Sequence, residues 1–180
     1  MEIEKTAIEG LLIIRPKVFT DGRGYFYESY NKRLFNEAGI TSEFVQDNQS
    51  LSQKGVLRGL HFQNPPHAQA KLVRVISGSV LDIAVDIRKN SPTYGKHVAI
   101  ELSEENKIMF FIPEGFAHGF VTLQDDTLFA YKCAGYYEKS SEDTLLWNDK
   151  DLNIDWGIVS PQLSPKDING KSFRDFVSLF

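Results

Sequence analysis

The chain has 180 residues, of which 42% are hydrophobic and 24% are charged, a composition typical of one soluble domain over residues 1–180. Its net charge of −4 lacks the basic excess of a nucleic-acid-binding domain, and its single cysteine, Cys133, excludes an internal disulfide and fits a reducing compartment. Because no apolar run is long enough to cross a bilayer and the N-terminal segment is not signal-like, we expect a cytoplasmic protein without nucleic-acid or membrane partners.

Short strands dominate the predicted elements. Strand patterns cover residues 11–15, 24–30, 44–48, 56–62, 71–76, 80–87, 97–102, 108–112, 116–123 and 127–133. A short helix is predicted over residues 31–37, a strand within 140–149 and a short helix within 164–180. The sequence Ser77-Gly78-Ser79 predicts a tight hairpin between two of the strands. Many short strands without helical crossovers predict a mainly β fold, either a sandwich or a barrel.

The strand over residues 56–62 carries the first candidate for chemistry. Strict alternation places Arg58, Leu60 and Phe62 on one face, and Gly59 and His61 on the other. His61 therefore lies within an apolar strand, on a face that Gly59 leaves open. A lone histidine in such a place is either a hydrogen-bonded core residue or a functional imidazole.

The next strand begins with Lys71, a cation in an apolar run, which is either functional or a solvated edge residue. A second block, residues 112–120, contains His118 after a Pro-Glu-Gly turn. Together the two blocks resemble the two-part signature of the cupin barrels. Lys71 occupies the position of the cupins' metal-ligand glutamate, and His61 and His67 are too widely spaced for the usual histidine pair. An ammonium repels a cation, so we expect a cupin-type jelly-roll barrel without a metal.

Four other features have a functional and a structural interpretation. Arg23 at the tip of an Asp-Gly-Arg-Gly turn is either an anion ligand or a solvated side chain. The polar residues 46–49 either hydrogen-bond to sugar hydroxyls or form an exposed edge strand. Tyr131 shares a strand face with Phe129, which alone favours core packing. Ser164 begins a segment that resembles a capped helix N-terminus.

Taken in order, these blocks resemble the dTDP-4-dehydrorhamnose 3,5-epimerases of deoxysugar biosynthesis. The matching stretches, which span nearly the whole chain, are residues 19–28, 46–50, 55–62, 71–73, 112–120, 131–137 and 163–167. The resemblance implies a cupin-type β-barrel with a few short helices, commonly a homodimer. It also implies an isomerase that converts dTDP-4-keto-6-deoxy-D-glucose to dTDP-4-keto-L-rhamnose without a cofactor.

The resemblance further implies roles for individual residues. His61 matches the general base, Asp167 the carboxylate that pairs with it, and Lys71 the cation beside the keto oxygen. Tyr131 matches the proton donor on the opposite face, and Tyr137 the aromatic residue that stacks on thymine. The other substrate-contacting positions match Arg23, Glu28, Gln46, Asn48, Arg58, His118, Glu142 and Lys166.

The chemistry of the reaction fits these residue types. Inverting a carbon beside a ketone requires a base that removes a C–H proton, a cation that stabilises the enolate, and an acid on the other face. The same set serves an epimerase that inverts only C3 or C5, and a 3,4-ketoisomerase of a related dTDP-keto-sugar remains an alternative. A non-catalytic sugar-binding cupin is a further alternative, but a binding protein needs no acid–base pair.

Overall fold

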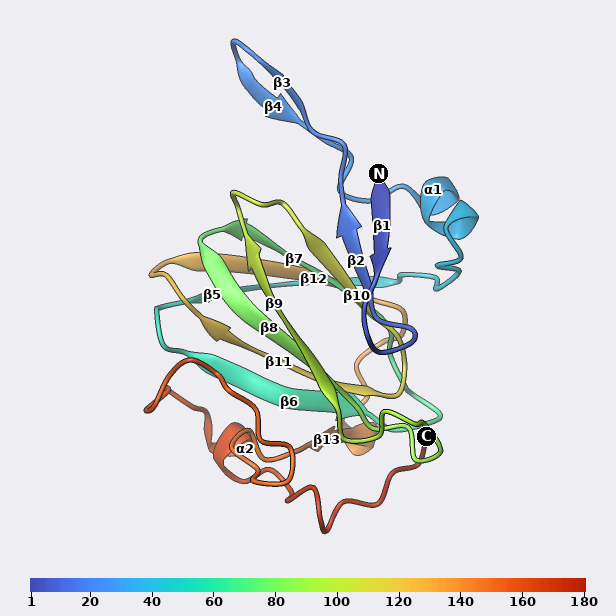
Figure 1. Ribbon diagram of the computed structural model, residues 1–180, viewed down its shortest axis with the longest axis vertical. Helices are drawn as coiled ribbons and strands as arrows, with labels where there is room; N and C mark the ends of the chain where they lie inside the picture. The colour runs from blue at the N-terminus through green and yellow to red at the C-terminus, as the bar shows by residue number, and fades with distance from the viewer.

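Two antiparallel sheets face each other and form the body of the computed structural model, which describes residues 1–180 (Figure 1). The six-stranded sheet has the order β1 (Glu2–Lys5), β2 (Leu12–Arg15), β10 (Met109–Ile112), β7 (Lys71–Ser77), β12 (Thr127–Cys133) and β5 (Gln46–Ser52). The five-stranded sheet has the order β13 (Glu142–Thr144), β6 (Leu57–Gln63), β11 (Phe116–Thr122), β8 (Ser79–Asp86) and β9 (His97–Ser103). The helices are α1 (Lys32–Glu37), η1 (Lys139–Ser141) and α2 (Pro165–Ile168). This architecture confirms the predicted mainly β, cupin-type fold with a few short helices.

Apolar clusters cover both faces of the central strands in the two sheets. Between the sheets, Val73 and Phe129 of one sheet pack with Phe120 of the other, and the Phe120 and Phe129 rings stack at 4.2 Å. On the outer side of the five-stranded sheet, a second cluster joins Leu60 to Trp156 and other residues of the C-terminal segment. Helix α1 covers part of the six-stranded sheet in the same way. The patterns of the central strands therefore reflect two apolar environments on opposite sides of each strand, whereas β5 and β9 expose alternate residues.

Two local predictions were wrong. Ser77-Gly78-Ser79 does not form a hairpin, because β7 pairs with β10 and β12 whereas β8 pairs with β9 and β11 of the other sheet. Gly78, with φ +82°, turns the chain from one sheet to the other while packed closely against Thr127. The predicted strand over residues 24–30 ends at Phe26, where the hairpin of β3 (Phe19–Asp21) and β4 (Gly24–Phe26) ends.

Strict alternation in β6 was also wrong. Opposite β11, His61 pairs with His118 and Arg58 with Phe120, so three steps along β6 match two steps along β11. This extra residue is a β-bulge, and beyond it the inward face changes phase. Arg58 therefore shares the interior face with His61, whereas Leu60 belongs to the outer apolar cluster.

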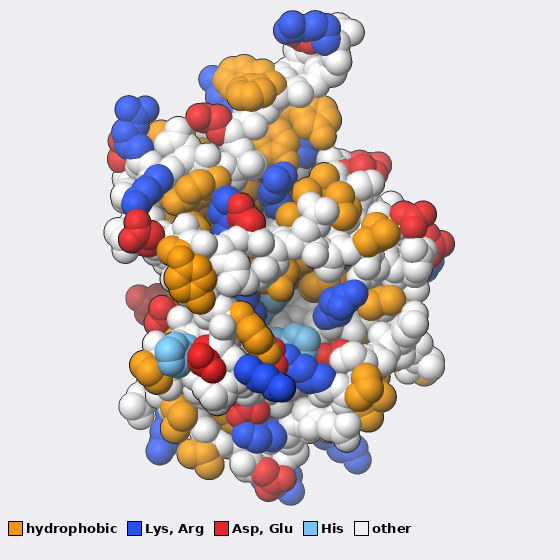
Figure 2. Space-filling view, turned by 180° about the vertical axis from the view of Figure 1, so that it is seen from behind, with side chains coloured by type: hydrophobic (Ala, Val, Ile, Leu, Met, Phe, Trp, Pro, Cys, Tyr) orange, Lys and Arg blue, Asp and Glu red, His pale blue; other side chains and the backbone are white.

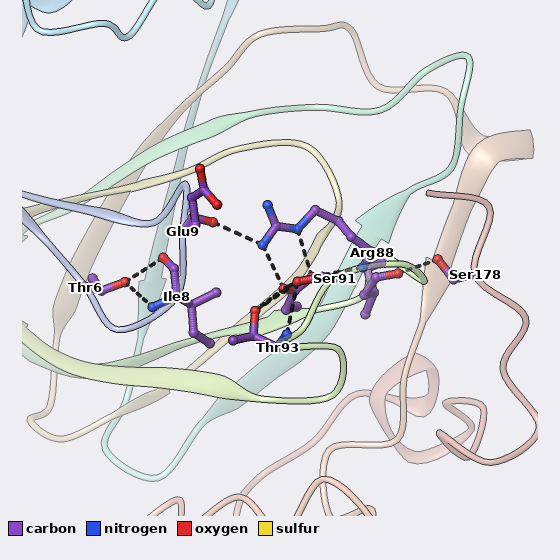
Figure 3. A network of polar contacts seen from close by, with 9 residues as sticks. Thr6, Ile8, Glu9, Arg88, Ser91, Thr93 and Ser178 are labelled. Atoms are coloured by element: carbon purple, nitrogen blue, oxygen red, sulfur yellow. Dashed lines mark hydrogen bonds and ion pairs between the residues drawn. The ribbon is translucent and has the colours of Figure 1, made fainter.

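A buried polar network ties the two ends of the chain to the β8–β9 loop (Figure 3). Arg88 donates to both carboxylate oxygens of Asp86 and to the carbonyl of Glu9. Ser91 and Thr93 also donate to Asp86, each at 2.6 Å. Burial opposes ionisation of Asp86, but these hydrogen bonds outweigh it and hold its pKa at about 2. In the same network Ser178 donates to the carbonyl of Ile87, which fastens the C-terminal segment.

The β3–β4 hairpin projects away from the body of the molecule (Figure 1). Its strands pair only with each other, and its large side chains Phe19, Tyr25 and Phe26 are 53%, 58% and 67% exposed. No helix of the protein has the length and apolar character needed to span a bilayer.

Candidate active site

His61 on β6 and Asp167 in α2 form a close pair, with His61 Nε2 2.7 Å from Asp167 Oδ1. The side chain of Asp167 is 2% exposed and that of His61 is 29% exposed. Ser164 caps α2 and donates to Asp167 Oδ2, and the backbone N–H of Gly59 donates to Asp167 Oδ1. Burial raises the pKa of Asp167, but the contacts with His61, Ser164 and Gly59 outweigh it and leave the pKa at about 2. The carboxylate is therefore ionised and fixed.

The approach of β6 to β11 next to His61 requires glycine at two facing positions. The Cβ that a larger residue would place at Gly59, where φ is +147°, would lie 2.5 Å from the Gly119 Cα. A Cβ on Gly119 would likewise lie 2.8 Å from the carbonyl oxygen of Arg58. At the bulge, β6 and β11 therefore approach too closely for any larger residue at these two positions.

The electrostatic environment keeps His61 neutral. Burial is the largest influence and lowers its pKa, Asp167 raises it, and the ammonium groups of Lys166 and Lys71 lower it. The result is a pKa below the usual 6.5. When Nε2–H donates to Asp167, Nδ1 holds a free lone pair, so the neutral ring can accept a proton.

Lys71 begins β7 on the interior face and donates from Nζ to the His61 carbonyl at 3.4 Å. Its neighbours in the sheet are Ile112 and Cys133. Burial lowers the pKa of Lys71, with a smaller raising influence from Cys133 and Asp82. A partly desolvated ammonium exerts a stronger field on a nearby oxygen than a solvated one.

Tyr131 lies on β12, opposite Asn48 of β5 and Val73 of β7. It packs against the cluster between the sheets, 6.0 Å from the Phe129 ring, so its phenol faces the interior. Burial raises the pKa of Tyr131. The phenol is therefore protonated at neutral pH and can act as an acid.

A second imidazole–carboxylate pair lies beside the first. His118 is directly opposite His61 in the β6–β11 ladder, and its Nε2 is 3.0 Å from both carboxylate oxygens of Asp82. His118 is 7% exposed and Asp82 is fully buried. Sequence reasoning missed Asp82, although an acid in the apolar run of β8 gives the same signal that Lys71 gives in β7.

Polar side chains extend the site toward the rim. Tyr137 donates to Glu142 at 3.2 Å, and Glu142 also forms an ion pair with Lys166. Gln46 accepts from the backbone N–H of Tyr137 and donates to Asn48. These contacts place Tyr137, Glu142, Lys166, Gln46 and Asn48 at one continuous edge of the site.

At the other side, Arg58 donates from Nε and one Nη to the buried Ser52 Oγ, each at 3.2 Å. Ser52 was not identified from the sequence, because a serine in a polar strand gives no distinguishing signal. The hydroxyl of Ser50, two residues earlier on the same face, is buried without a hydrogen-bond partner.

Arg23 and Glu28 lie apart from this group. Arg23, with a side chain 91% exposed, pairs with Asp21 inside the projecting hairpin, and Glu28 accepts from Asn31. The body of the protein is hollowed on one face, where histidine atoms are visible inside and lysine and arginine side chains lie around the opening (Figure 2). The structure contains no group of three or more His, Cys, Asp or Glu residues that could hold a metal ion.

Comparison with known proteins decides the family. The protein-family model described as dTDP-4-dehydrorhamnose 3,5-epimerase matches residues 5–175 of the chain. The chain belongs to this family. The resemblance inferred from the sequence blocks is therefore confirmed.

Individual members of the dTDP-4-dehydrorhamnose 3,5-epimerase family align with this chain over almost their full length. The chain is 56% identical to the enzyme of that name from Shigella flexneri, over 97% of each chain. A crystal structure of the family member from Elizabethkingia anophelis superposes with a TM-score of 0.93 at 52% identity, over 97% of each chain. The dTDP-6-deoxy-D-glucose-3,5-epimerase of Legionella pneumophila, solved in complex with dTDP-4-keto-L-rhamnose, gives 0.94 at 50% identity, over 98% of this chain and 94% of that one.

Proposed function

We propose that the protein converts dTDP-4-keto-6-deoxy-D-glucose to dTDP-4-keto-L-rhamnose by inverting C3 and C5. The observation that carries the proposal is that the base and the acid come from two different sheets that face each other. His61 comes from the five-stranded sheet and Tyr131 from the facing six-stranded sheet. A sugar ring between the sheets would therefore have a base on one face and an acid on the other, as inversion requires.

The proposed reaction proceeds through an enolate. His61 removes the proton from the carbon beside the ketone, and Asp167 stabilises the imidazolium that forms. The electron pair of the C–H bond moves to the C4 oxygen, where the Lys71 ammonium stabilises the developing negative charge. As the C4 carbonyl re-forms, Tyr131 donates its proton to the opposite face of the same carbon. The His61 imidazolium then releases its proton to water and Tyr131 takes one up from water, which restores both groups. Repetition at the second carbon completes the double inversion.

The polar rim suits the nucleotide part of the substrate. We assign Tyr137 to the stacking contact with thymine, and Arg58 and Lys166 to the diphosphate, which an arginine fork and an ammonium both recognise. Gln46, Asn48, His118 and Glu142 are assigned to hydrogen bonds with the remaining polar groups. A dTDP-keto-sugar as the ligand class is supported by one family relative, which is solved with dTDP-4-keto-L-rhamnose.

Deuterium exchange tests the function. With the purified protein and dTDP-4-keto-6-deoxy-D-glucose in D₂O, we expect deuterium at both C3 and C5 and formation of the rhamno-configured product, measured by NMR. Exchange at one carbon alone would indicate a single-carbon epimerase, and a moved carbonyl would indicate a ketoisomerase. Binding without exchange would indicate a non-catalytic sugar-binding protein.

The homodimer is part of the proposal, because it gives the projecting hairpin a function. Arg23 and Glu28 do not reach the His61 site of their own chain, and the hairpin exposes Phe19, Tyr25 and Phe26. A second copy of the chain supplies the missing surface: the hairpin of one protomer covers the site of its partner and brings Arg23 to the substrate there.

Subunit mixing tests this arrangement. Arg23→Ala and His61→Ala proteins are each expected to be nearly inactive, but a mixed dimer has one site with an intact His61 and an intact partner hairpin. Random reassociation of equal amounts should restore about a quarter of wild-type activity. Mixing without any recovery, under conditions where exchange of subunits is demonstrated, would contradict the shared site.

A further inference from the structure

Three glutamine side chains converge on one short stretch of backbone, residues 135–138, called the arch below. Gln69 Nε2 donates to the Gly135 carbonyl at 2.5 Å, and Gln46 Oε1 accepts from the Tyr137 N–H at 3.2 Å. Gln63 contacts the arch twice, donating to the Tyr136 carbonyl at 3.2 Å and accepting from the Glu138 N–H at 2.8 Å. These glutamines belong to β5, β6 and the segment before β7, so three separate parts of the chain fix the same four residues.

Gln63 is the central member of this set. It is 6% exposed, and its second donor contact, to the His67 carbonyl at 2.6 Å, also ties the arch to the loop that follows β6. Its amide thus satisfies the backbone on both sides of Tyr137 at once. A buried amide with donor and acceptor both satisfied holds its partners rigidly, because breaking either contact leaves a polar group unpaired.

The Tyr137 ring itself has little other support. Tyr137 is 55% exposed and the neighbouring Tyr136 is 72% exposed, and the phenol of Tyr137 has one side-chain partner, Glu142. The direction of the ring is therefore set mainly by the backbone of the arch. Gln63 lies two residues after His61 on the same interior face of β6 and opposite Glu142 in the β6–β13 ladder.

We infer that Gln63 is a positioning residue for nucleotide recognition: it acts through Tyr137 by holding the arch in the conformation that presents the ring to the base. The inference rests on the proposed stacking role of Tyr137 and goes beyond it. Holding the arch before the ligand arrives removes an ordering cost from binding. Gln63 thereby links the strand that carries the base His61 to the residue that receives the nucleobase.

Replacement of Gln63 by Leu separates binding from chemistry. We expect Gln63→Leu to weaken dTDP binding, measured by calorimetry, by about tenfold, because the arch must be ordered at the cost of binding free energy. KM for the keto-sugar should rise similarly, while kcat at saturating substrate stays within about twofold, since His61 and Tyr131 are untouched. Gln124→Leu is the matched control and should change neither quantity. Gln124 is exposed in the turn that precedes β12, whereas the arch follows the other end of that strand.

A double-mutant cycle with Tyr137→Ala decides whether Gln63 acts through the ring. If it does, Gln63→Leu should have less than about a twofold effect on dTDP affinity in the Tyr137→Ala background. An equal loss in both backgrounds, or an unchanged affinity in the single variant, would overturn the inference. Should Gln63→Leu fail to fold, Gln69→Leu, which removes a single contact to the arch, takes its place with a smaller expected loss.

The binding cycle uses dTDP alone, so its outcome is independent of turnover. A protein that binds dTDP with coupled Gln63 and Tyr137 but does not epimerise the keto-sugar would contradict the proposed reaction and retain the inference. An active enzyme in which Gln63 and Tyr137 are not coupled in dTDP binding would retain the proposed reaction and contradict the inference.

Discussion

His61 and Asp167 share a hydrogen bond of 2.7 Å although they are 106 positions apart in the chain. The contact joins a central strand of the barrel to a four-residue helix in the C-terminal segment. The helix is short, but Ser164 caps it and holds the second oxygen of Asp167. The base and the group that orients it are thus supported by different parts of the fold, and the following predictions depend on that arrangement.

Removal of the imidazole should stop the reaction without unfolding the protein. In His61→Ala, Asp167 keeps its contacts with Ser164 and the Gly59 N–H, so the buried carboxylate remains satisfied. We expect kcat to fall by about 10²–10⁴ or more, measured by NMR assay, and a cooperative thermal unfolding transition to be retained, measured by calorimetry. His97→Ala on β9 is the control and should retain activity. Near-wild-type turnover of His61→Ala would contradict its role as the base.

The pH dependence of kcat/KM should reflect the lowered pKa of His61. Burial disfavours the imidazolium, so the neutral base persists at lower pH, and activity is lost only as pH falls through a value below 6.5. Asp167 raises the pKa of His61, so Asp167→Asn should move the acid limb to still lower pH while the plateau falls. An acid limb that moves upward in Asp167→Asn would show that the carboxylate does not stabilise the imidazolium.

Tyr131→Phe should separate proton removal from proton return. The variant keeps the ring that packs near Phe129 but loses the acidic hydroxyl. We expect epimerisation to slow by about 10²–10⁴, while exchange of the substrate proton that faces His61 continues in D₂O, observed by NMR. Complete loss of exchange, with the fold intact, would argue against an acid and a base on separate faces.

Acid should destabilise the protein between pH 4 and 2 through Asp86 and Asp167. Each has a pKa of about 2 in the folded protein against an ordinary 3.8, so its stabilisation is complete above 3.8 and is lost as pH falls toward 2. The shift corresponds to about 2 kcal/mol for each group. Asp86→Asn should therefore flatten the fall in unfolding free energy over this range, measured by denaturant titration at several pH values.

Asp21 supplies the control for this prediction. It also pairs with an arginine, but the pair lies on the exposed hairpin, where solvent screens the interaction. Asp21→Asn should leave the acid limb of stability nearly unchanged. An equal effect of the two substitutions would show that burial of the Asp86 network is not the source of its contribution.

The central strands were predictable because they are covered on both sides. The pattern of β8 separates Leu81, Ile83 and Val85 from Val80 and Ala84, and these two sets belong to different apolar clusters. The sequence alone does not tell which set faces the other sheet, because the C-terminal segment that covers the outer set has no regular pattern. β1 was missed for a similar reason, since Glu2–Lys5 is mostly exposed and charged.

The strand pattern singled out His61 and Lys71 as candidates, but the roles of the site residues came from the resemblance. Spacing along the chain gives no means of pairing His61 with Asp167, and a serine such as Ser52 or a glutamine such as Gln63 has no local signal. Their partners become visible only once distant strands are aligned. The phase change in β6 was also hidden, because Gly59 in a strand indicates a bulge or a close approach without saying which residues face inward.

The single extra residue in β6 has a consequence for insertions and deletions in this strand. If the same residues followed a strict two-residue repeat, the Arg58 guanidinium would point into the apolar cluster beneath the C-terminal segment, while His61 kept its place. Deleting one residue between Arg58 and His61 would instead remove the bulge and leave the guanidinium two positions before the imidazole, still on the interior face. Such a deletion would keep both the cation and the base in the interior, but it would remove or displace the Gly59 N–H that holds the Asp167 carboxylate.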